Sequence, residues 1–216
     1  MQAVCITRDD ASTIPEQIEF YGARASQYPQ TMELADRQVL ARCPLSSHCL
    51  ELASGSGRWT QQLLRVCRRI TAVDASPELH ARNRALTVDS RVDYVVADLF
   101  DYRPLARSDL VFAGFWLSHV PPGRFESFWS MVADALSPGG RVVMVDDGVR
   151  NNDGVLQFAS DPTGGGARRR LADGRGFTIV KVAYDPVELE SLLAELGWTA
   201  RVTLLSPVSY VLEAHR

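Results

Sequence analysis

Cysteine is scarce in this sequence, and its spacing argues against both a metal site and a disulfide framework. The four cysteines are Cys5, Cys43, Cys49 and Cys67, and no two of them form a Cys-x-x-Cys pair. We expect Cys49 in a strand and Cys67 in a helix, each among apolar residues, where a free thiol behaves as a small buried hydrophobic group. The sequence therefore predicts no bound metal and a reducing compartment, the cytoplasm.

A long apolar run and a strong charge of either sign are also missing. No stretch approaches the about 20 apolar residues that a membrane-spanning helix needs, and Asp9 and Asp10 stand where a signal peptide would be apolar. The 23 Lys and Arg residues against 26 Asp and Glu residues give a formal net charge of −3. This charge argues against a surface for nucleic acid or a membrane. We therefore expect a small-molecule substrate as the partner, and the sequence is compatible with a homodimer.

Short apolar runs alternate with amphipathic stretches through the middle of the chain. Helical periodicity occurs at residues 57–68, 77–86 and 123–137. The expected strands around these helices are Cys49–Ala53, Ile70–Val73, Val92–Ala97, Asp109–Gly114 and Arg141–Asp146. Such alternation is typical of right-handed βαβ units. It predicts an α/β fold with a doubly wound, mostly parallel, Rossmann-like sheet that helices cover on both faces.

The segments on either side of this core predict additions to it. Residues 14–42 have a helical pattern that breaks near Tyr28-Pro29, because a residue before proline avoids the α region. They predict an N-terminal helical cap. Asp173-Gly174, between strand-like runs at 167–171 and 176–182, predicts a β-hairpin inserted before the last helix.

The last part of the chain completes the expected sheet. A helix near 186–197 is followed by strands near 199–205 and 207–214, and these two strands with the five of the core would give a seven-stranded sheet. We therefore interpret residues 1–216 as a single domain. Its expected parts are a cap (1–45), a cofactor-binding core (46–150), a hairpin insertion (151–184) and a terminal helix with a strand pair (185–216).

The most informative segment runs from the first strand into the first helix of the core. Gly55 and Gly57 let the backbone turn tightly there and approach a ligand, although an ordinary turn would also use them. Thr60 stands where a dinucleotide-binding loop has its third glycine. Glu51 would repel a pyrophosphate and attract a sulfonium, and Asp74 ends the second strand, where a carboxylate accepts ribose hydroxyls. The residues favour an adenosine with a cationic tail.

Five motifs in this order resemble those of class I S-adenosylmethionine-dependent methyltransferases. Glu51-x-Ala53-x-Gly55-x-Gly57 resembles the first motif, with Ala53 in place of its first glycine. The other four are Val73-Asp74, Ala97-Asp98-Leu99-Phe100, the stretch from Asp109 to Pro121, and Leu136-Ser137-Pro138-Gly139-Gly140. The resemblance implies S-adenosylmethionine as the cofactor, with S-adenosylhomocysteine as its product. It implies that the cofactor is bound by Glu51, Ala53, Gly55, Gly57, Trp59, Asp74, Ala75, Asp98, Leu99, Phe100 and Phe115.

A second resemblance concerns the substrate. Residues 115–121 together with residues 173–181 resemble small methyltransferases of natural-product pathways, in particular those that methylate a phosphonate oxygen. This implies O-methylation of a small anionic metabolite, a phosphonate or a carboxylate. In the same family, Tyr21 and Tyr28 resemble residues that close over the methyl group, but both would also suit the packing face of a cap. Trp116 would suit a substrate wall and the core equally well.

The expected hairpin gives a separate argument for an anion. If Asp173-Gly174 is a two-residue turn, Arg175 pairs with Ala172 and Phe177 with Arg170. Arg168, Arg170, Arg175 and Lys181 then share one face, and four like charges there call for an anionic ligand or acidic neighbours. The alternative is a solvated face of an exposed hairpin.

His119 follows the fourth strand, at the edge where open α/β sheets bind their ligands. It would serve as a general base for a hydroxyl or amine, as a donor to an oxyanion, or as a cap of its loop. His119 and Tyr28 are therefore the candidate catalytic residues. Methylation of a neutral hydroxyl or amine stays an alternative, as does a protein that binds the nucleotide without catalysis.

Overall fold

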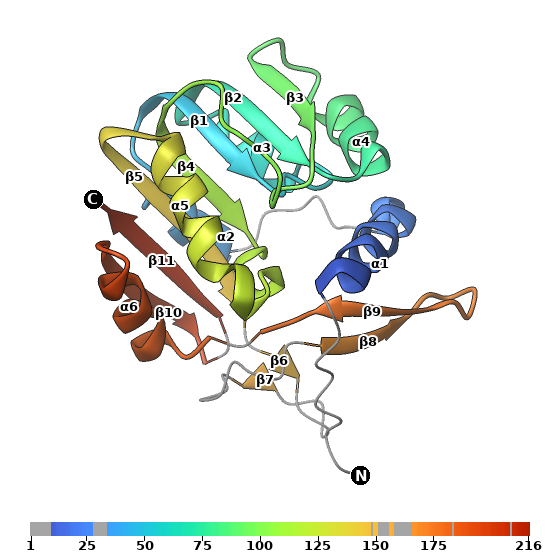
Figure 1. The fold of residues 1–216 in the computed structure, drawn as a ribbon. Helices are drawn as coiled ribbons and strands as arrows, with labels where there is room; N and C mark the ends of the chain where they lie inside the picture. The colour runs from blue at the N-terminus through green and yellow to red at the C-terminus, as the bar shows by residue number, and fades with distance from the viewer. Residues whose placement is uncertain are drawn as a thin grey trace.

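The computed structural model describes residues 10–27, 34–147, 149–150, 156–157, 166–182, 184–207 and 209–216. Its centre is a seven-stranded sheet in the order β10-β11-β5-β4-β1-β2-β3 (Figure 1). All of its strands run in the same direction except β11, which is antiparallel to both of its neighbours. The strands are β1 (Ser46–Leu52), β2 (Cys67–Asp74), β3 (Val92–Val96), β4 (Ser108–Gly114), β5 (Leu136–Asp147), β10 (Thr199–Ser206) and β11 (Ser209–His215). The predicted mixed sheet is confirmed.

Helices cover both faces of the sheet because its central strands alternate between two apolar layers. In β4, for example, Val111 and Ala113 belong to one core, and Leu110 and Phe112 to the other. Helices α5 (Phe125–Ala135) and α6 (Pro186–Glu195) cover the first face. Helices α2 (Leu34–Leu40), α3 (Arg58–Leu63) and α4 (Pro77–Thr87) lie on the second. The loops at the carboxyl ends of the strands are thereby left to bind a ligand.

A separate layer is formed by helix α1 (Asp10–Ala23) and the hairpin of β8 (Gly166–Arg170) and β9 (Gly176–Val180), which lie side by side in Figure 1. Phe20 of α1 packs with Phe177 and Ile179 of β9 in a small core. The open edge of β9 is covered by side chains of the helix, since the backbone N–H of Thr178 donates to Glu16 and that of Val180 to Gln17. The hairpin therefore lies under the cap.

The hairpin turn differs from the predicted one. The N–H of Leu171 donates to the carbonyl of Arg175 at 2.9 Å, so the loop has three residues, with Gly174 in the left-handed region at φ 90°. Arg169 therefore pairs with Phe177, where the two-residue turn would have paired Arg170 with Phe177. The predicted register was wrong by one residue, and such a shift moves every side chain to the opposite face.

Other element bounds also differ from the sequence expectation. Helix α3 ends at Leu63, so Cys67 lies in β2 and not in a helix. Strand β5 begins at Leu136, before the predicted start. A 3-10 helix, Ala25–Gln27, follows α1, and short strands β6 (Val149–Arg150) and β7 (Leu156–Gln157) pair with each other. Two more 3-10 helices are η2 (Leu117–His119) and η3 (Pro122–Arg124).

No helix in the described part of the chain is long and apolar enough to cross a membrane. The division into four segments stays a prediction.

Two glycines with positive φ permit a matched test of the packing between α3 and α4. A Cβ at Gly57 (φ 95°) would lie 2.5 Å from Oδ1 of Asn83, whereas a Cβ at Gly174 (φ 90°) would meet nothing within 4 Å. We expect Gly174→Ala to cost about 1 kcal/mol of unfolding free energy, for the left-handed backbone alone. Gly57→Ala should cost roughly 1–3 kcal/mol more because of the overlap. Urea unfolding of both variants measures the difference, and equal losses would refute a steric role for Gly57.

Candidate active site

A cavity of about 430 Å³ opens at the carboxyl ends of β1, β2 and β4, next to α1 and β9. It brings together most of the predicted site residues from distant parts of the sequence. Those in its lining are Tyr21, Ala53, Gly55, Trp59, Asp74, Ala75, Asp98, Leu99, Phe115, Trp116, His119 and Lys181. The predicted residues that do not line it are Glu51, Gly57, Phe100, Arg168, Arg170 and Arg175. Tyr28 lies outside the described residues.

Asp74 ends β2 and anchors the turn that follows β1. Its Oδ2 accepts the backbone N–H of Gly55 and its Oδ1 that of Ser76, both at 2.9 Å. A carboxylate that ends the second strand of such a fold is placed to accept ribose hydroxyls. Burial raises the pKa of Asp74, and the backbone N–H groups oppose that rise. The carboxylate is thus fixed in place before a ligand binds.

The loop around Gly55 leaves the room that an adenosine needs. Gly55 and Ala53 both adopt left-handed conformations, at φ 55° and 52°, and both line the cavity. A Cβ at Gly55 would meet only the carbonyl oxygen of Ala53, at 3.9 Å. Leu79 and Leu99 contribute apolar walls, and Asp98 is held by the N–H of Phe100 at 3.0 Å. These residues fit S-adenosylmethionine: a carboxylate for the ribose, apolar walls for the base, and an open backbone between them.

Glu51 has a different place from the one that its sequence position suggested. Its side chain is buried behind the loop, where it accepts the hydroxyl of Thr60 at 2.7 Å, and Thr60 in turn accepts a bond from Asn83. Burial raises the pKa of Glu51 to about 8. The group is therefore neutral at pH 7 in the unliganded protein and supports the loop from behind. Gly57, which abuts Asn83, also supports the loop without lining the cavity.

Ser54 lines the cavity and pairs with His80, although nothing in the sequence marked either residue. The hydroxyl of Ser54 lies 3.2 Å from Nε2 of His80, which burial keeps neutral by lowering its pKa to about 4. Nδ1 of His80 is buried with no partner among the described residues. A buried N–H without an acceptor is rarer than an unused lone pair, so the proton belongs on Nε2, which donates to Ser54. The hydroxyl proton of Ser54 is then available to the cavity that it lines.

Arg58 was also missed, although it follows the glycine loop directly. It lines the cavity and forms an ion pair with the buried Asp36 of α2. Nε of Arg58 is buried without a hydrogen-bond partner among the described atoms. Trp59, the next residue, lies over Gly114, where a Cβ would come within 2.4 Å of its ring. The glycine at the end of β4 is thus required by the indole at the start of α3.

His119 connects three elements at the end of the cavity that Tyr21, Trp116 and Lys181 also line. A carbonyl only accepts, so Nδ1 of His119 donates to the carbonyl of Val180 at 2.6 Å, and Nε2 accepts the hydroxyl of Tyr21 at 2.9 Å. Burial, followed by the charge of Lys181, lowers the pKa of His119 to about 3. The ring is neutral across the physiological range. Trp116 lies beside it, with ring centroids 6.2 Å apart, and Phe100 packs behind Trp116 at 5.9 Å.

Lys181 reaches the same end of the cavity from the strand side. Its Nζ donates to Oγ of Ser118 at 2.7 Å and to Oδ1 of Asp147 at 2.8 Å. The fully buried Asp146 lies 3.6 Å away and accepts both the N–H and the hydroxyl of Ser118. The ammonium therefore has carboxylates on one side and the cavity on the other.

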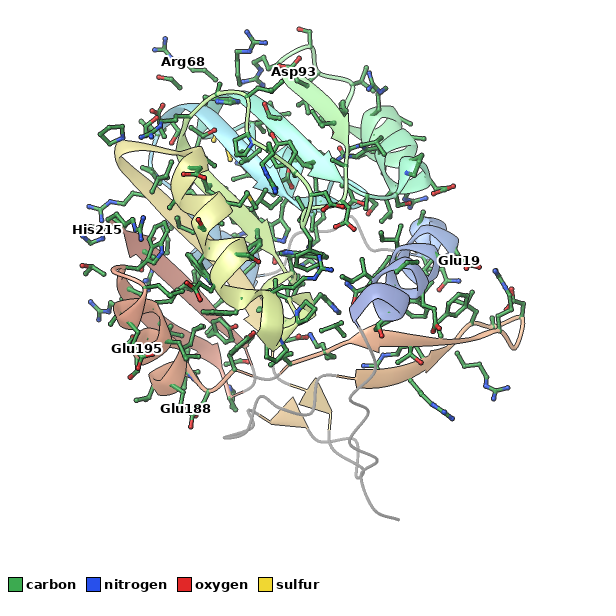
Figure 2. The ribbon with its side chains drawn as sticks, in the orientation of Figure 1. Glu19, Arg68, Asp93, Glu188, Glu195 and His215 are labelled. Carbon is green, nitrogen blue, oxygen red and sulfur yellow. The ribbon has the colours of Figure 1, made fainter. Side chains whose placement is uncertain are left out.

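The cationic face that was predicted for the hairpin does not form. Arg168 and Arg170 are exposed and point away from the α1 layer, because the register places Arg169 on the inner side with Phe177. Arg169, which the two-residue turn had assigned to the opposite face, lines the cavity. Arg175 pairs with Asp173 at 2.9 Å and with Glu19, which is labelled above the hairpin in Figure 2, at 3.1 Å. Arg169 and Lys181 are the hairpin cations that reach the cavity.

The burial of Glu51 predicts a pH-dependent stability. Its pKa is raised from 4.5 to about 8 on folding, so the ionised form is disfavoured in the folded state. This cost is absent below about pH 4.5 and grows until about pH 8. Glu51→Gln removes the titration. The unfolding free energy of the wild type relative to that variant should therefore fall by on the order of 3 kcal/mol from pH 5 to pH 8. Urea titrations at both pH values test this, and a constant difference would contradict it.

Comparisons with known proteins agree with this site. Residues 49–140 match a family model described as a methyltransferase domain. A search of curated protein sequences finds no match. A solved structure described as a DhpI-SAM-HEP complex is 36% identical, with a TM-score of 0.84 over 97% of this chain and 100% of that one. The DhpI-SAH complex is 35% identical, with a TM-score of 0.83 over 96% and 98% of the two chains.

A more distant structure shares the fold alone. The glycopeptide N-methyltransferase MtfA, complexed with S-adenosylmethionine, is 18% identical, with a TM-score of 0.60 over 83% of this chain and 91% of that chain. The two DhpI structures are 35% and 36% identical to this chain over nearly its whole length, and the cavity contains a carboxylate, a glycine loop and apolar walls that fit S-adenosylmethionine. The chain belongs to the class I S-adenosylmethionine-dependent methyltransferases, and it is an enzyme that uses S-adenosylmethionine as its cofactor.

Proposed function

We propose that this methyltransferase methylates an anionic oxygen, that of a phosphonate, on a small metabolite. The observation that carries the proposal is that Arg169 and Lys181 line the same cavity as the cofactor loop and Asp74. Arginine grips a tetrahedral oxyanion through two parallel hydrogen bonds, and lysine adds a mobile point charge. A relative that is 36% identical over nearly the whole chain is described as a complex with SAM and HEP together.

The residues of the chain have two tasks in this reaction. Bound S-adenosylmethionine would supply an electrophilic methyl group to the acceptor oxygen, and the electron pair of the sulfur–carbon bond would remain on sulfur. Asp74, the Gly55 loop and the walls formed by Leu79 and Leu99 hold the nucleoside. Tyr21, Phe115 and Trp116 enclose the acceptor end and exclude water. Such catalysis consists mainly of alignment.

The state of His119 favours an acceptor that is already ionised. A hydroxyl or amine acceptor would require a base whose pKa lies near the working pH, and the pKa of His119 is about 3. A phosphonate oxygen carries its charge at neutral pH and needs no proton removed. His119 then acts by fixing the hydroxyl of Tyr21, to which it is bonded at 2.9 Å. Methylation of a neutral acceptor is the less favoured alternative.

Two further properties stay proposals. The three described cysteines, Cys43, Cys49 and Cys67, are free and buried, which suits a reducing compartment such as the cytoplasm. A homodimer remains a prediction from the sequence.

A pair of adjacent arginines tests the anion site. Arg169 lines the cavity and Arg168 is exposed on the other face of β8. With labelled S-adenosylmethionine and simple alkylphosphonates as acceptors, Arg169→Ala should raise the acceptor KM roughly tenfold or more, because a charged hydrogen bond is lost. Calorimetry should show an unchanged affinity for S-adenosylhomocysteine. Arg168→Ala should leave both quantities near the wild-type values. If both variants behave alike, Arg169 does not bind the acceptor.

The His119→Ala variant tests whether His119 acts as a general base in the methyl transfer. The ionisation of the acceptor is common to both enzymes, so the ratio of the wild-type kcat/KM to that of the variant isolates the histidine. We expect this ratio to be constant between pH 5.5 and pH 8, because the imidazole is neutral throughout. The variant should lose more in KM than in kcat, as an orienting residue does. A ratio that rises with pH through about 6.5 would identify His119 as a general base.

A further inference from the structure

The two aspartates at the end of β5 have contrasting environments. Asp146 is fully buried, and its oxygens accept three hydrogen bonds, from the N–H and hydroxyl of Ser118 and from the N–H of Asp147. Asp147 lines the cavity, with its side chain 35% exposed. Its Oδ1 accepts Lys181, and its Oδ2 has no hydrogen-bond partner among the described residues. Asp146 therefore anchors the loop of Ser118, and Asp147 keeps an oxygen for a ligand.

The carboxylate of Asp147 lies in the cavity that is proposed to bind the phosphonate, and it would repel an acceptor whose only charge is negative. Asp147 and the phosphonate would repel each other in a partly enclosed cavity, where the charges are poorly screened. Asp147 and Asp146 also oppose the charge of Lys181, at 2.8 and 3.6 Å. A phosphonate without another charge would meet Arg169, the opposed cation of Lys181 and one open carboxylate. A ligand that brings its own cation removes the conflict with that carboxylate.

We propose that Asp147 is a specificity-determining residue that selects zwitterionic acceptors, in which an ammonium group accompanies the anionic oxygen that is methylated. The inference rests on the proposed function. Oδ2 of Asp147 accepts the ammonium, while Arg169 and Lys181 hold the oxyanion. The aromatic rings of Tyr21 and Trp116 line the same end of the cavity and suit a cation over their faces. The acceptor is thereby an aminoalkylphosphonate rather than an alkylphosphonate.

A simpler role for Asp147 makes a different prediction. If the carboxylate only orients Lys181, its loss weakens every phosphonate by the same factor. If it binds the ammonium, its loss weakens only the acceptors that carry one. Asp147→Asn keeps the shape of the side chain and an oxygen for Lys181 but removes the charge. Comparison of acceptors within one variant therefore separates the two roles.

The experiment measures kcat/KM for 2-aminoethylphosphonate, 2-hydroxyethylphosphonate and propylphosphonate, which differ only in an ammonium, a hydroxyl or a methyl group at the same position. We expect the wild type to prefer the aminoalkyl acceptor over propylphosphonate at least tenfold, with the hydroxyl acceptor between them. Asp147→Asn should abolish this preference and leave propylphosphonate within about threefold of its wild-type value. Glu195→Gln, the same chemical change on α6 (labelled in Figure 2) and outside the cavity lining, should leave the preference intact.

The outcomes also separate this inference from the proposed function. A wild-type enzyme that binds S-adenosylhomocysteine but methylates none of the three acceptors refutes the proposed function. Methylation of all three without preference for the ammonium, or with preference for propylphosphonate, keeps the function and overturns the inference. Equal losses for all acceptors in Asp147→Asn also overturn it, since they assign Asp147 to the orientation of Lys181.

Discussion

The end of the cavity around His119 and Lys181 depends on the backbone of one short segment, residues 178–182. On one side, the N–H groups of Thr178 and Val180 donate to side chains of α1. On the other side, the carbonyl of Val180 accepts Nδ1 of His119, and the N–H of Val182 donates to the carbonyl of Ser118 at 2.7 Å. The cap, the hairpin and the loop after β4 are thereby joined through backbone groups of one segment, with the side chains of Glu16, Gln17 and His119 as three of the partners. The positions of Lys181 and His119 follow from these bonds.

Burial decides the charge state of several groups in and around this site, and the resulting pattern has a chemical meaning. His119 and Glu51 are both neutral at pH 7, because burial disfavours their charged forms more than neighbouring groups stabilise them. Nζ of Lys181 lies 2.8 Å from Oδ1 of Asp147 and 3.6 Å from Oδ1 of Asp146. The cavity thus combines neutral hydrogen-bonding groups with a compact set of opposed charges. Such a set suits the alignment of a charged acceptor better than the removal of a proton.

The sequence predicted that the residues of the expected cofactor site converge, but it predicted the wrong face for the hairpin arginines, and the difference has a physical reason. Asp74 and Asp98 follow parallel strands, whose carboxyl ends meet at one edge, so their convergence follows from the order of the elements. Which residue of β8 faces the cavity depends on the length of the loop between β8 and β9. A three-residue loop replaced the expected two-residue loop and brought Arg169 inward instead of Arg168 and Arg170. No sequence motif marks Asp147 as a site residue, because only tertiary packing brings its carboxylate to Lys181.

The backbone at the cavity is strained at two residues that are not glycine, so the sequence alone does not predict their left-handed conformation. Ala53 and Phe115 line the cavity with φ values of 52° and 57°, in a region that costs a residue with a side chain about 1–2 kcal/mol. The next N–H after Ala53, that of Ser54, donates to the carbonyl of Val73, and the N–H of Phe115 donates to that of Val145. The hydrogen bonding of the sheet thus extends to both turns and holds them in this conformation. The left-handed residues turn the chain away at the ends of β1 and β4, and the space that this opens is part of the cavity that we propose for cofactor and acceptor.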